Sequence, residues 1–187
     1  INTKGAIADN IPAQLAAGSA GTKVVVADDD GYTHISTTFD SNSDKVILVY
    51  QDGNNSNYGT AVVGTVTASD KSISFGTPAV FESAATMSTN VVFDSNSNKV
   101  VITYRDTGNS NRGTAIVGTV SSTSISFGSA TVFETGETIN MSSTFDSSNN
   151  KVVIAFEDED DSGKGKAIVG TVSGTSISFG TAAVFND

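Results

Sequence analysis

The sequence predicts an all-β protein of three tandem four-stranded antiparallel meander units after an extended N-terminal segment. Three observations carry this prediction: a long phrase recurs, the residue choice favours strands, and turn-rich joints separate short apolar runs. Val, Ile, Thr, Ser, Gly and Phe are abundant, whereas leucine occurs only as Leu15 and Leu48. Leucine is a strong helix former, while β-branched and aromatic residues suit a pleated sheet.

The repeat is marked by phenylalanines: Phe39, Phe93 and Phe145 are 54 and 52 residues apart. A period near fifty residues is typical of arrays of supersecondary units. It divides the chain into a predicted N-terminal extension or attachment segment and a repeat domain. The predicted bounds are 1–31 for the extension and 32–187 for the repeat domain, with units at about 32–87, 88–139 and 140–187.

Four strands are expected in the second unit, at residues 89–93, 99–105, 113–120 and 124–133. The joints between them, "DSNSN", "DTGNSN" and "SST", are short and rich in turn residues, which predicts antiparallel hairpins. The second run, "KVVITY", is apolar at consecutive positions, as expected of a strand covered on both faces. In the fourth run Ile125 and Phe127 alternate with small polar residues, which is typical of a strand with one buried face.

Two further residue types place the third and fourth runs. Pro78 lies in the fourth run of the first unit, and proline suits an edge strand because it cannot donate to a β-ladder. Gly64, Gly118 and Gly170 interrupt the third run at the same place each time. A glycine inside a strand predicts that another group approaches closely or that the strand twists sharply.

A four-stranded unit repeated about every fifty residues is typical of a β-propeller blade. The alternative is three hairpin pairs that form a sandwich or a stacked β array. Propellers usually close with about four to eight blades, and this chain holds three. Three blades leave two exposed lateral faces, so we expect assembly with other copies of the chain. Further blades outside this sequence, or blades that form no closed ring, are the alternatives.

The composition argues against several classes of function. A net charge of −10 disfavours nucleic acid and anionic membranes as partners, and the apolar runs are too short to span a bilayer. His34 is the only histidine, so no catalytic triad or His-rich metal site is expected. Arg105 and Arg112 are the only arginines, too few for the arginine cluster of sialidase-like hydrolases. The sequence therefore predicts a non-enzymatic protein without catalytic residues.

Two acidic stretches raise the question of calcium. Asp40, Asn42 and Asp44 form a D-x-N-x-D pattern, in which alternate oxygens can converge on a hard cation, but the glycine and distant glutamate of a calcium loop are missing. Asp and Asn also bond their own backbone in turns without an ion, which is the favoured interpretation. The loop "EDEDDSG", which contains Asp158 and Asp160, is interpreted in the same way as solvated. No cofactor is expected, with calcium at these residues as the alternative.

Binding is expected at the hairpin loop tips, where residues vary while the scaffold stays fixed. Tyr58 lies in one such Gly/Asn-rich joint, Arg112 holds the matching place in the second unit, and Lys164 lies close to it in the third. These three residues are the candidate binding residues. In the N-terminal segment a strand is expected at 23–27 and a short helix within "IPAQLAAGS".

Two sets of phrases resemble known proteins. The phrases "VGTVSGTSISFG" and "FDSNSNKVVITYRD" resemble tandem repeats in large virion-associated proteins of marine phages, especially cyanophage-like ones, over about residues 33–185. The phrase "LAAGSAGTKVVVADDDGYTH" looks like one common in phage fibre and tail proteins, where it often joins a virion-attached part to a distal part. Here Thr22, Lys23 and Val24 replace the Gln-Val-Leu that is usual in that phrase. The resemblance implies a phage structural protein and carries over no functional residues.

The sequence as a whole therefore leads us to expect a non-enzymatic virion structural protein, a fibre, decoration or adhesin subunit that displays β-repeat loops for attachment. The expected location is the virion surface or the extracellular space. The expected partners are other copies of the chain, other virion proteins and host surface glycans, with no nucleic acid and no membrane insertion. The alternative is a secreted bacterial adhesin or carbohydrate-binding propeller with calcium-stabilised loops.

Overall fold

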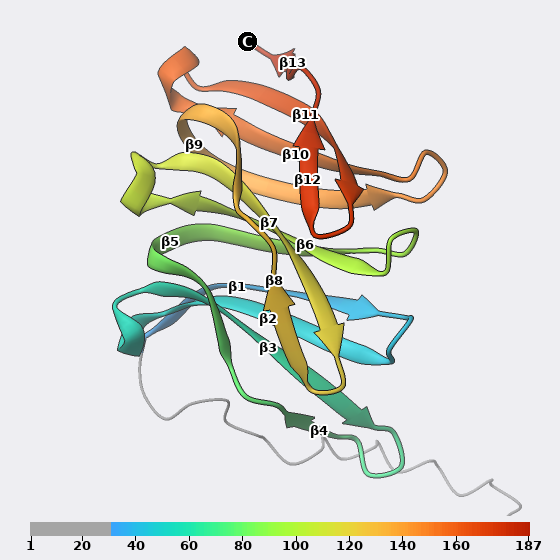
Figure 1. Ribbon diagram of the computed structural model, residues 1–187. Helices are drawn as coiled ribbons and strands as arrows, with labels where there is room; N and C mark the ends of the chain where they lie inside the picture. Colours follow the sequence, from blue (N-terminus) through green and yellow to red (C-terminus); the bar gives the residue numbers. More distant parts are fainter. Residues whose placement is uncertain (1–30) are drawn as a thin grey trace, which may run out of the picture.

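The computed structural model describes residues 31–187, and within them the chain is all-β. Strands are joined by tight turns and by three short 3-10 turns, and this part of the chain contains no α-helix (Figure 1). The predicted N-terminal segment, with its expected strand and helix, lies outside the described residues except for Gly31. The prediction of an all-β, antiparallel fold is confirmed.

The structure gives the bounds of every element. The strands are β1 Tyr32–Asp40, β2 Lys45–Asp52, β3 Tyr58–Thr67, β4 Ser72–Phe75, β5 Ala79–Asp94, β6 Lys99–Asp106, β7 Arg112–Ser121, β8 Ser124–Phe127, β9 Thr131–Asp146, β10 Lys151–Asp158, β11 Lys164–Ser173, β12 Ser176–Phe179 and β13 Ala183–Asn186. The 3-10 turns are η1 Gly53–Asn55, η2 Thr107–Asn109 and η3 Glu159–Asp161. Strand lengths of 8, 10, 4 and 16 residues occur twice in succession, in β2–β5 and β6–β9.

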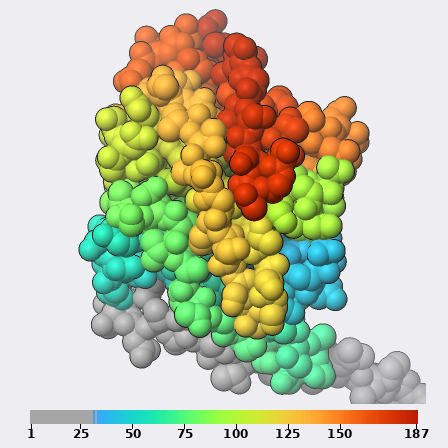
Figure 2. Space-filling view, in the orientation of Figure 1, coloured from blue at the N-terminus to red at the C-terminus, as the bar shows by residue number. Residues whose placement is uncertain are grey.

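All strand pairs are antiparallel, and together they form one 13-stranded sheet that is not closed. The hydrogen-bonded pairs fall into three sets, which we call the first strand group (residues 32–85), the second strand group (86–137) and the third strand group (138–186). The groups lie one above another in chain order (Figure 1). The space-filling view shows the same order, and β12 contacts β7 of the second group across their boundary (Figure 2).

The strands β5 and β9 each belong to two groups. The first residues of β5 pair with β3, for example Val80 with Thr60, and after a register shift the residues from Thr86 onward pair with β6. Strand β9 repeats this arrangement between β7 and β10. The strand expected at 89–93 is therefore the second half of a 16-residue strand.

The fourth run of each repeat is broken, which corrects the expectation of one strand over 124–133. Strand β8 ends at Phe127 and β9 begins at Thr131. A Cβ on Gly128 would overlap the carbonyl oxygen of Thr175 and lie 2.9 Å from its carbon, so the third group occupies the space beside this break. Pro78 lies in the corresponding break between β4 and β5, where it interrupts no ladder.

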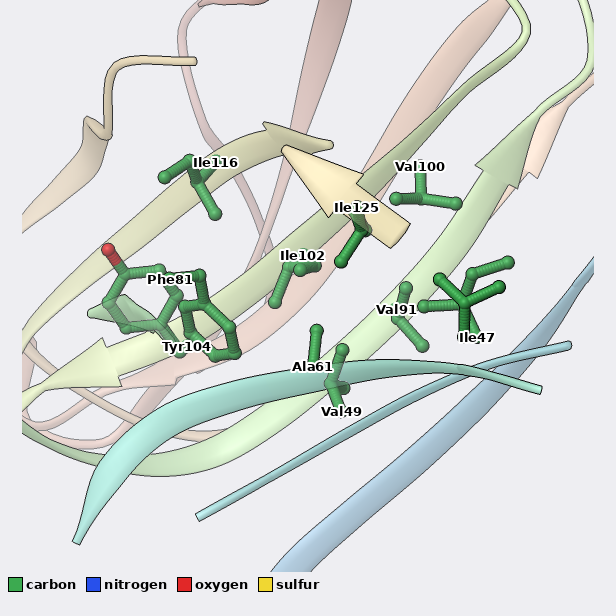
Figure 3. Close-up of a cluster of buried hydrophobic side chains, with 11 residues drawn as sticks. Ile47, Val49, Ala61, Phe81, Val91, Val100, Ile102, Tyr104, Ile116 and Ile125 are labelled. Atoms are coloured by element: carbon green, nitrogen blue, oxygen red, sulfur yellow. The ribbon is translucent and has the colours of Figure 1, made fainter. Parts of the chain in front are cut away.

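Two apolar clusters hold the three groups together. The first lies between the first and second groups (Figure 3) and contains Ile47, Val49, Ala61, Val63, Phe81, Val91, Val100, Ile102, Tyr104, Ile116 and Ile125. The second lies between the second and third groups and contains Val92, Val101, Ala115, Val117, Phe133, Val152, Ile154, Phe156, Ile168 and Ile177. Strand β6 is buried on both faces because Val100 and Ile102 face one cluster and Val101 the other, which confirms the prediction for "KVVITY".

The recurring glycines of the third strands lie against side chains of their own group. A Cβ on Gly118 would lie 2.7 Å from Val100 Cγ2 and 2.9 Å from Ile125 Cδ1. Gly64 and Gly170 face isoleucine and phenylalanine side chains in the same way. The predicted close approach at these glycines is confirmed, and it lets the fourth strand of each group pack onto the third.

Polar side chains join the first strands of neighbouring groups. Val91 N donates to Ser36 Oγ over 3.2 Å, which links the second group to the first. Ser143 N and Oγ both donate to Asn90 Oδ1, over 3.2 and 2.5 Å, which links the third group to the second. Short polar residues at these positions therefore satisfy backbone and side-chain groups between the apolar clusters.

Candidate binding surface

The three 3-10 turns lie along one side of the molecule, and the turns between β1 and β2, β5 and β6, and β9 and β10 lie along the opposite side (Figure 1). An aspartate before each 3-10 turn accepts a hydrogen bond from a backbone amide within it. Asp52 bonds Asn54 N at 3.2 Å and Asp106 bonds Asn109 N at 3.1 Å. Asp158 bonds Asp160 N at 3.1 Å. Aspartate suits this N-cap position because its oxygen satisfies an otherwise unpaired amide.

The candidate binding residues occupy matching places on this side. Tyr58, Arg112 and Lys164 are the first residues of β3, β7 and β11, and their Cα partners are the three capping aspartates. They therefore begin strands, and the loop tips themselves are the preceding 3-10 turns. All three are half-buried. We call these three residues the variable row, because the backbone around them is the same in each group and their side chains differ.

The cationic members of the row are held by nearby polar groups. Arg112 Nη1 donates to Asn109 Oδ1 at 3.3 Å, and Arg112 Nε is buried without a hydrogen-bond partner in the described part. Lys164 Nζ lies 3.4 Å from Asp161 Oδ1 and 3.9 Å from Asp187 Oδ1.

Two further cations, Arg105 and Lys166, form shorter ion pairs next to the row. Arg105 Nη2 lies 2.5 Å from Glu137 Oε1, which joins β6 to the strand that leads into the third group. Lys166 Nζ lies 2.6 Å from Asp158 Oδ2 and 2.9 Å from Asp161 Oδ2. The hydrogen bond that Lys166 donates to Asp158, and then the one that it donates to Asp161, raise the pKa of Lys166. The same bond from Lys166 lowers the pKa of Asp161.

In the second group the residue that corresponds to Lys166 is Thr114, so no lysine lies beside Asp106 there. Tyr104 Oη donates to Glu82 Oε2 at 3.1 Å, and burial, followed by the charge of Glu82, raises the pKa of Tyr104. Burial and then the Glu82 charge also raise the pKa of Asp106. The side chains along this side thus form a mixed set of acids and bases rather than a field of one sign.

The acidic turns for which calcium is the alternative accept hydrogen bonds from their own backbone. Asp40 is buried and accepts from Asn42 N at 2.9 Å, from Ser43 N at 3.2 Å and from Ser43 Oγ at 2.6 Å. Asp44 has a φ of 54°, as the tight turn requires. Of the other candidates, Asp158 bonds Lys166, and Asp160 Oδ2 accepts from Glu137 N at 3.2 Å.

Carboxylate oxygens of Asp40, Asp158 and Asp160 therefore accept hydrogen bonds from protein groups. Among residues 31–187 no three His, Cys, Asp or Glu side chains are grouped so that they could hold a metal ion.

Sequence reasoning missed the ion pairs of Arg105 and Lys166 and the Tyr104–Glu82 bond. One signal was available for Lys166, because it replaces the threonine that the first two repeats carry at this place, Thr60 and Thr114. A second signal was available for the Tyr104–Glu82 bond. Two repeats end in "VFE", the first of which contains Glu82, whereas the third has "VFN". Which side chains they meet depends on the stacking of the groups, which the spacing of the repeats leaves open.

No family model, no curated protein and no solved structure matches this chain. Over residues 31–187 the structure has no helix of the length and apolar character needed to cross a bilayer.

Proposed function

We propose that this protein is a non-enzymatic attachment subunit of a phage particle, and that each strand group corresponds to one blade of an open, propeller-like array. The observation that carries the proposal is the variable row: one backbone frame is repeated three times and presents a different side chain at the same place each time. A fixed scaffold with variable positions at one side is the arrangement by which binding proteins alter specificity without altering the fold.

The chemistry of the row supports a polar ligand with hydroxyl or carboxylate groups, such as a surface glycan. Tyr58 offers an amphipathic ring, and the half-buried Arg112 offers the N–H donors of its guanidinium. Lys164 adds a cation whose Nζ lies 3.4 Å from Asp161 and 3.9 Å from Asp187. The phage role rests on the resemblance of the repeat phrases. The alternative role as a secreted bacterial adhesin uses the same row.

The test is binding of the labelled protein to a panel of purified bacterial capsular polysaccharides and lipopolysaccharides. The double variant Tyr58→Ala with Arg112→Ala is expected to lose at least about tenfold in affinity, since truncation of interface Tyr or Arg side chains often costs 1–2 kcal/mol or more. The matched control is Lys99→Ala with Lys151→Ala, because these half-buried lysines begin β6 and β10 on the opposite side. Both variants should unfold at nearly the parent's urea concentration.

Three results would count against the proposal. Unchanged binding in the Tyr58 and Arg112 variant would remove the row from recognition. An equal loss in the lysine control would show that the effect is not local to the row. Release of reducing sugar from any polysaccharide in the panel would identify a hydrolase instead.

A further inference from the structure

The outer face of the third strand group is exposed, whereas the corresponding face of the second group is buried against a neighbouring group. In the second group Phe133 is 8% exposed and Val117 is fully buried, both in the cluster against the third group. Their counterparts in the third group, Phe185 and Val169, are 66% and 46% exposed. We call Val169, Gly180 and Phe185 the open third-group face.

Gly180 shows the same difference in backbone packing between the third group and the other two. Its counterparts Gly76 and Gly128 each leave room for a carbonyl of the next group, since a Cβ on either would overlap the carbonyl oxygen of Thr123 or Thr175. A Cβ on Gly180 would meet only Val169 O, at 3.9 Å. The third group therefore has a glycine shaped for a neighbouring turn, and no described residue fills that place.

The opposite end of the array carries the other half of the same interface. Phe93 and Val120 of the second group pack against the first cluster, and Phe145 and Val172 of the third group pack against the second. The equivalent residues of the first group are Phe39 and Val66, and each is 55% exposed. These two residues, with the half-buried Phe75, are called the open first-group face.

The ring contacts inside the chain indicate how the two faces would meet. Phe81 lies 6.0 Å from Phe127, centroid to centroid, and Phe133 lies 5.6 Å from Phe179. Phe185 and Phe75 are the next pair in this series, but they lie at opposite ends of one molecule. Tyr50 and Val62 of the first group are already buried, so the free part of that end is the region of Phe39, Val66 and Phe75.

We propose that the open third-group face binds the open first-group face of a second copy of this chain, head to tail. The proposal rests on the continuity of the two internal interfaces, because the residue types that pack twice within the chain are left exposed once at each end. It is independent of what the variable row binds. A head-to-tail contact uses two different surfaces, so it builds rings or open filaments rather than a simple two-fold dimer.

The experiment uses sedimentation velocity on the full chain over a range of concentrations. The parent is expected to form species larger than its 19.1 kDa mass. A tail variant, Val169→Lys with Phe185→Lys, and a head variant, Phe39→Lys with Val66→Lys, are each expected to be monomeric. Mixed together, they retain one intact face each and are expected to form a dimer of the two variants that grows no further.

The matched control is Val132→Lys with Val184→Lys. These valines are also exposed, at 36% and 48%, but they hold the same place in two repeats and stay exposed whether or not a next group follows. The control should assemble like the parent. Gly180→Val serves as a second tail variant, because the described structure has open space at that glycine; it is expected to stay folded by circular dichroism and to remain monomeric.

Several outcomes would overturn the proposal. One is a parent that stays monomeric at the highest concentration. Another is a head variant that still assembles, which would indicate a contact between two third-group faces. Equal loss of assembly in the control, or a mixture of head and tail variants that stays monomeric, would also overturn it. Because the lysine substitutions lie away from Tyr58 and Arg112, loss of assembly and loss of glycan binding can be distinguished.

Discussion

Gly128 and Gly180 stand at the same place in the second and third strand groups. Each donates its amide to a valine carbonyl of the adjoining strand, Val117 O at 2.9 Å and Val169 O at 3.0 Å. Only Gly128 lies against another strand group, at the Thr175 carbonyl. The local backbone is thus alike in both groups, and the need for a glycine comes from the neighbouring group.

The largest difference in the free energy of unfolding is expected between two single variants, in each of which one of these glycines is replaced by valine. Gly128→Val should cost on the order of 4 kcal/mol or prevent folding, because the side chain would collide with backbone that cannot move without separating two groups. Gly180→Val should change the free energy of unfolding by less than about 0.5 kcal/mol. Urea unfolding by circular dichroism measures both. Equal losses would contradict the difference between the two groups.

Phe133 and Phe185, which lie in the strands that follow these glycines, extend the same comparison. Phe133→Ala should destabilise by about 3–5 kcal/mol, because its ring packs against Phe156 and Phe179 in the second cluster. Phe185→Ala should cost less than about 1 kcal/mol, since a mostly exposed ring gains little from burial. Both are measured at a dilution where the parent is monomeric. A large loss for Phe185→Ala would mean that the ring is packed in the monomer.

Gly118 and Gly170 provide the case in which the two groups should behave alike. A Cβ on Gly118 would lie 2.9 Å from Ile125 Cδ1, and one on Gly170 would lie 2.9 Å from Ile177 Cδ1, both within their own group. Valine at either position should cost about 1–3 kcal/mol by overpacking. Thermal unfolding of the two variants checks this. Clearly unequal losses would show that the third group is looser than the second.

The smallest effects are expected at the capping aspartates, where replacement by asparagine should lower the free energy of unfolding in the third group and raise it in the second. Asp158→Asn replaces the carboxylate that pairs with Lys166 by a neutral amide. It should cost about 1–2 kcal/mol, less than breaking a fully buried pair, because the lysine is partly exposed and keeps Asp161. Asp106→Asn keeps the cap but removes a carboxylate beside Glu82, so it should stabilise slightly at pH 7.

The pH dependence tests that sign. Because the folded-state pKa of Asp106 is raised above its usual 3.8, the folded state binds this proton more tightly, and stability falls as the pH rises through the folded pKa. The advantage of Asp106→Asn should therefore vanish in acid and grow above about pH 4. Urea midpoints from pH 3 to pH 7 measure it. An advantage that is constant with pH would rule out titration of Asp106 as the cause.

The prediction of an all-β antiparallel chain was accurate because strand preference and turn chemistry act over a few residues. The alternation of Ile125 and Phe127 with exposed serines, and the burial of Tyr104, follow from the same local patterns. The break at Gly128 was not predicted, because the sequence there still looks strand-like and the cause is a turn of the following group. The ion pairs of Arg105 and Lys166 were missed for the same reason, since their partners are brought near by register and stacking.

The shared strands β5 and β9 have a consequence for how the molecule unfolds. Each is one continuous strand that supplies ladder hydrogen bonds to two successive groups. If one group unfolds, the strand that it shares with the next group is therefore no longer held in place along its whole length. Repeat arrays often open unit by unit when the interface between units is weak. Here the coupling runs through the main chain as well as through the apolar clusters. The three groups should therefore exchange their deepest amide protons at a common rate, as one cooperative block.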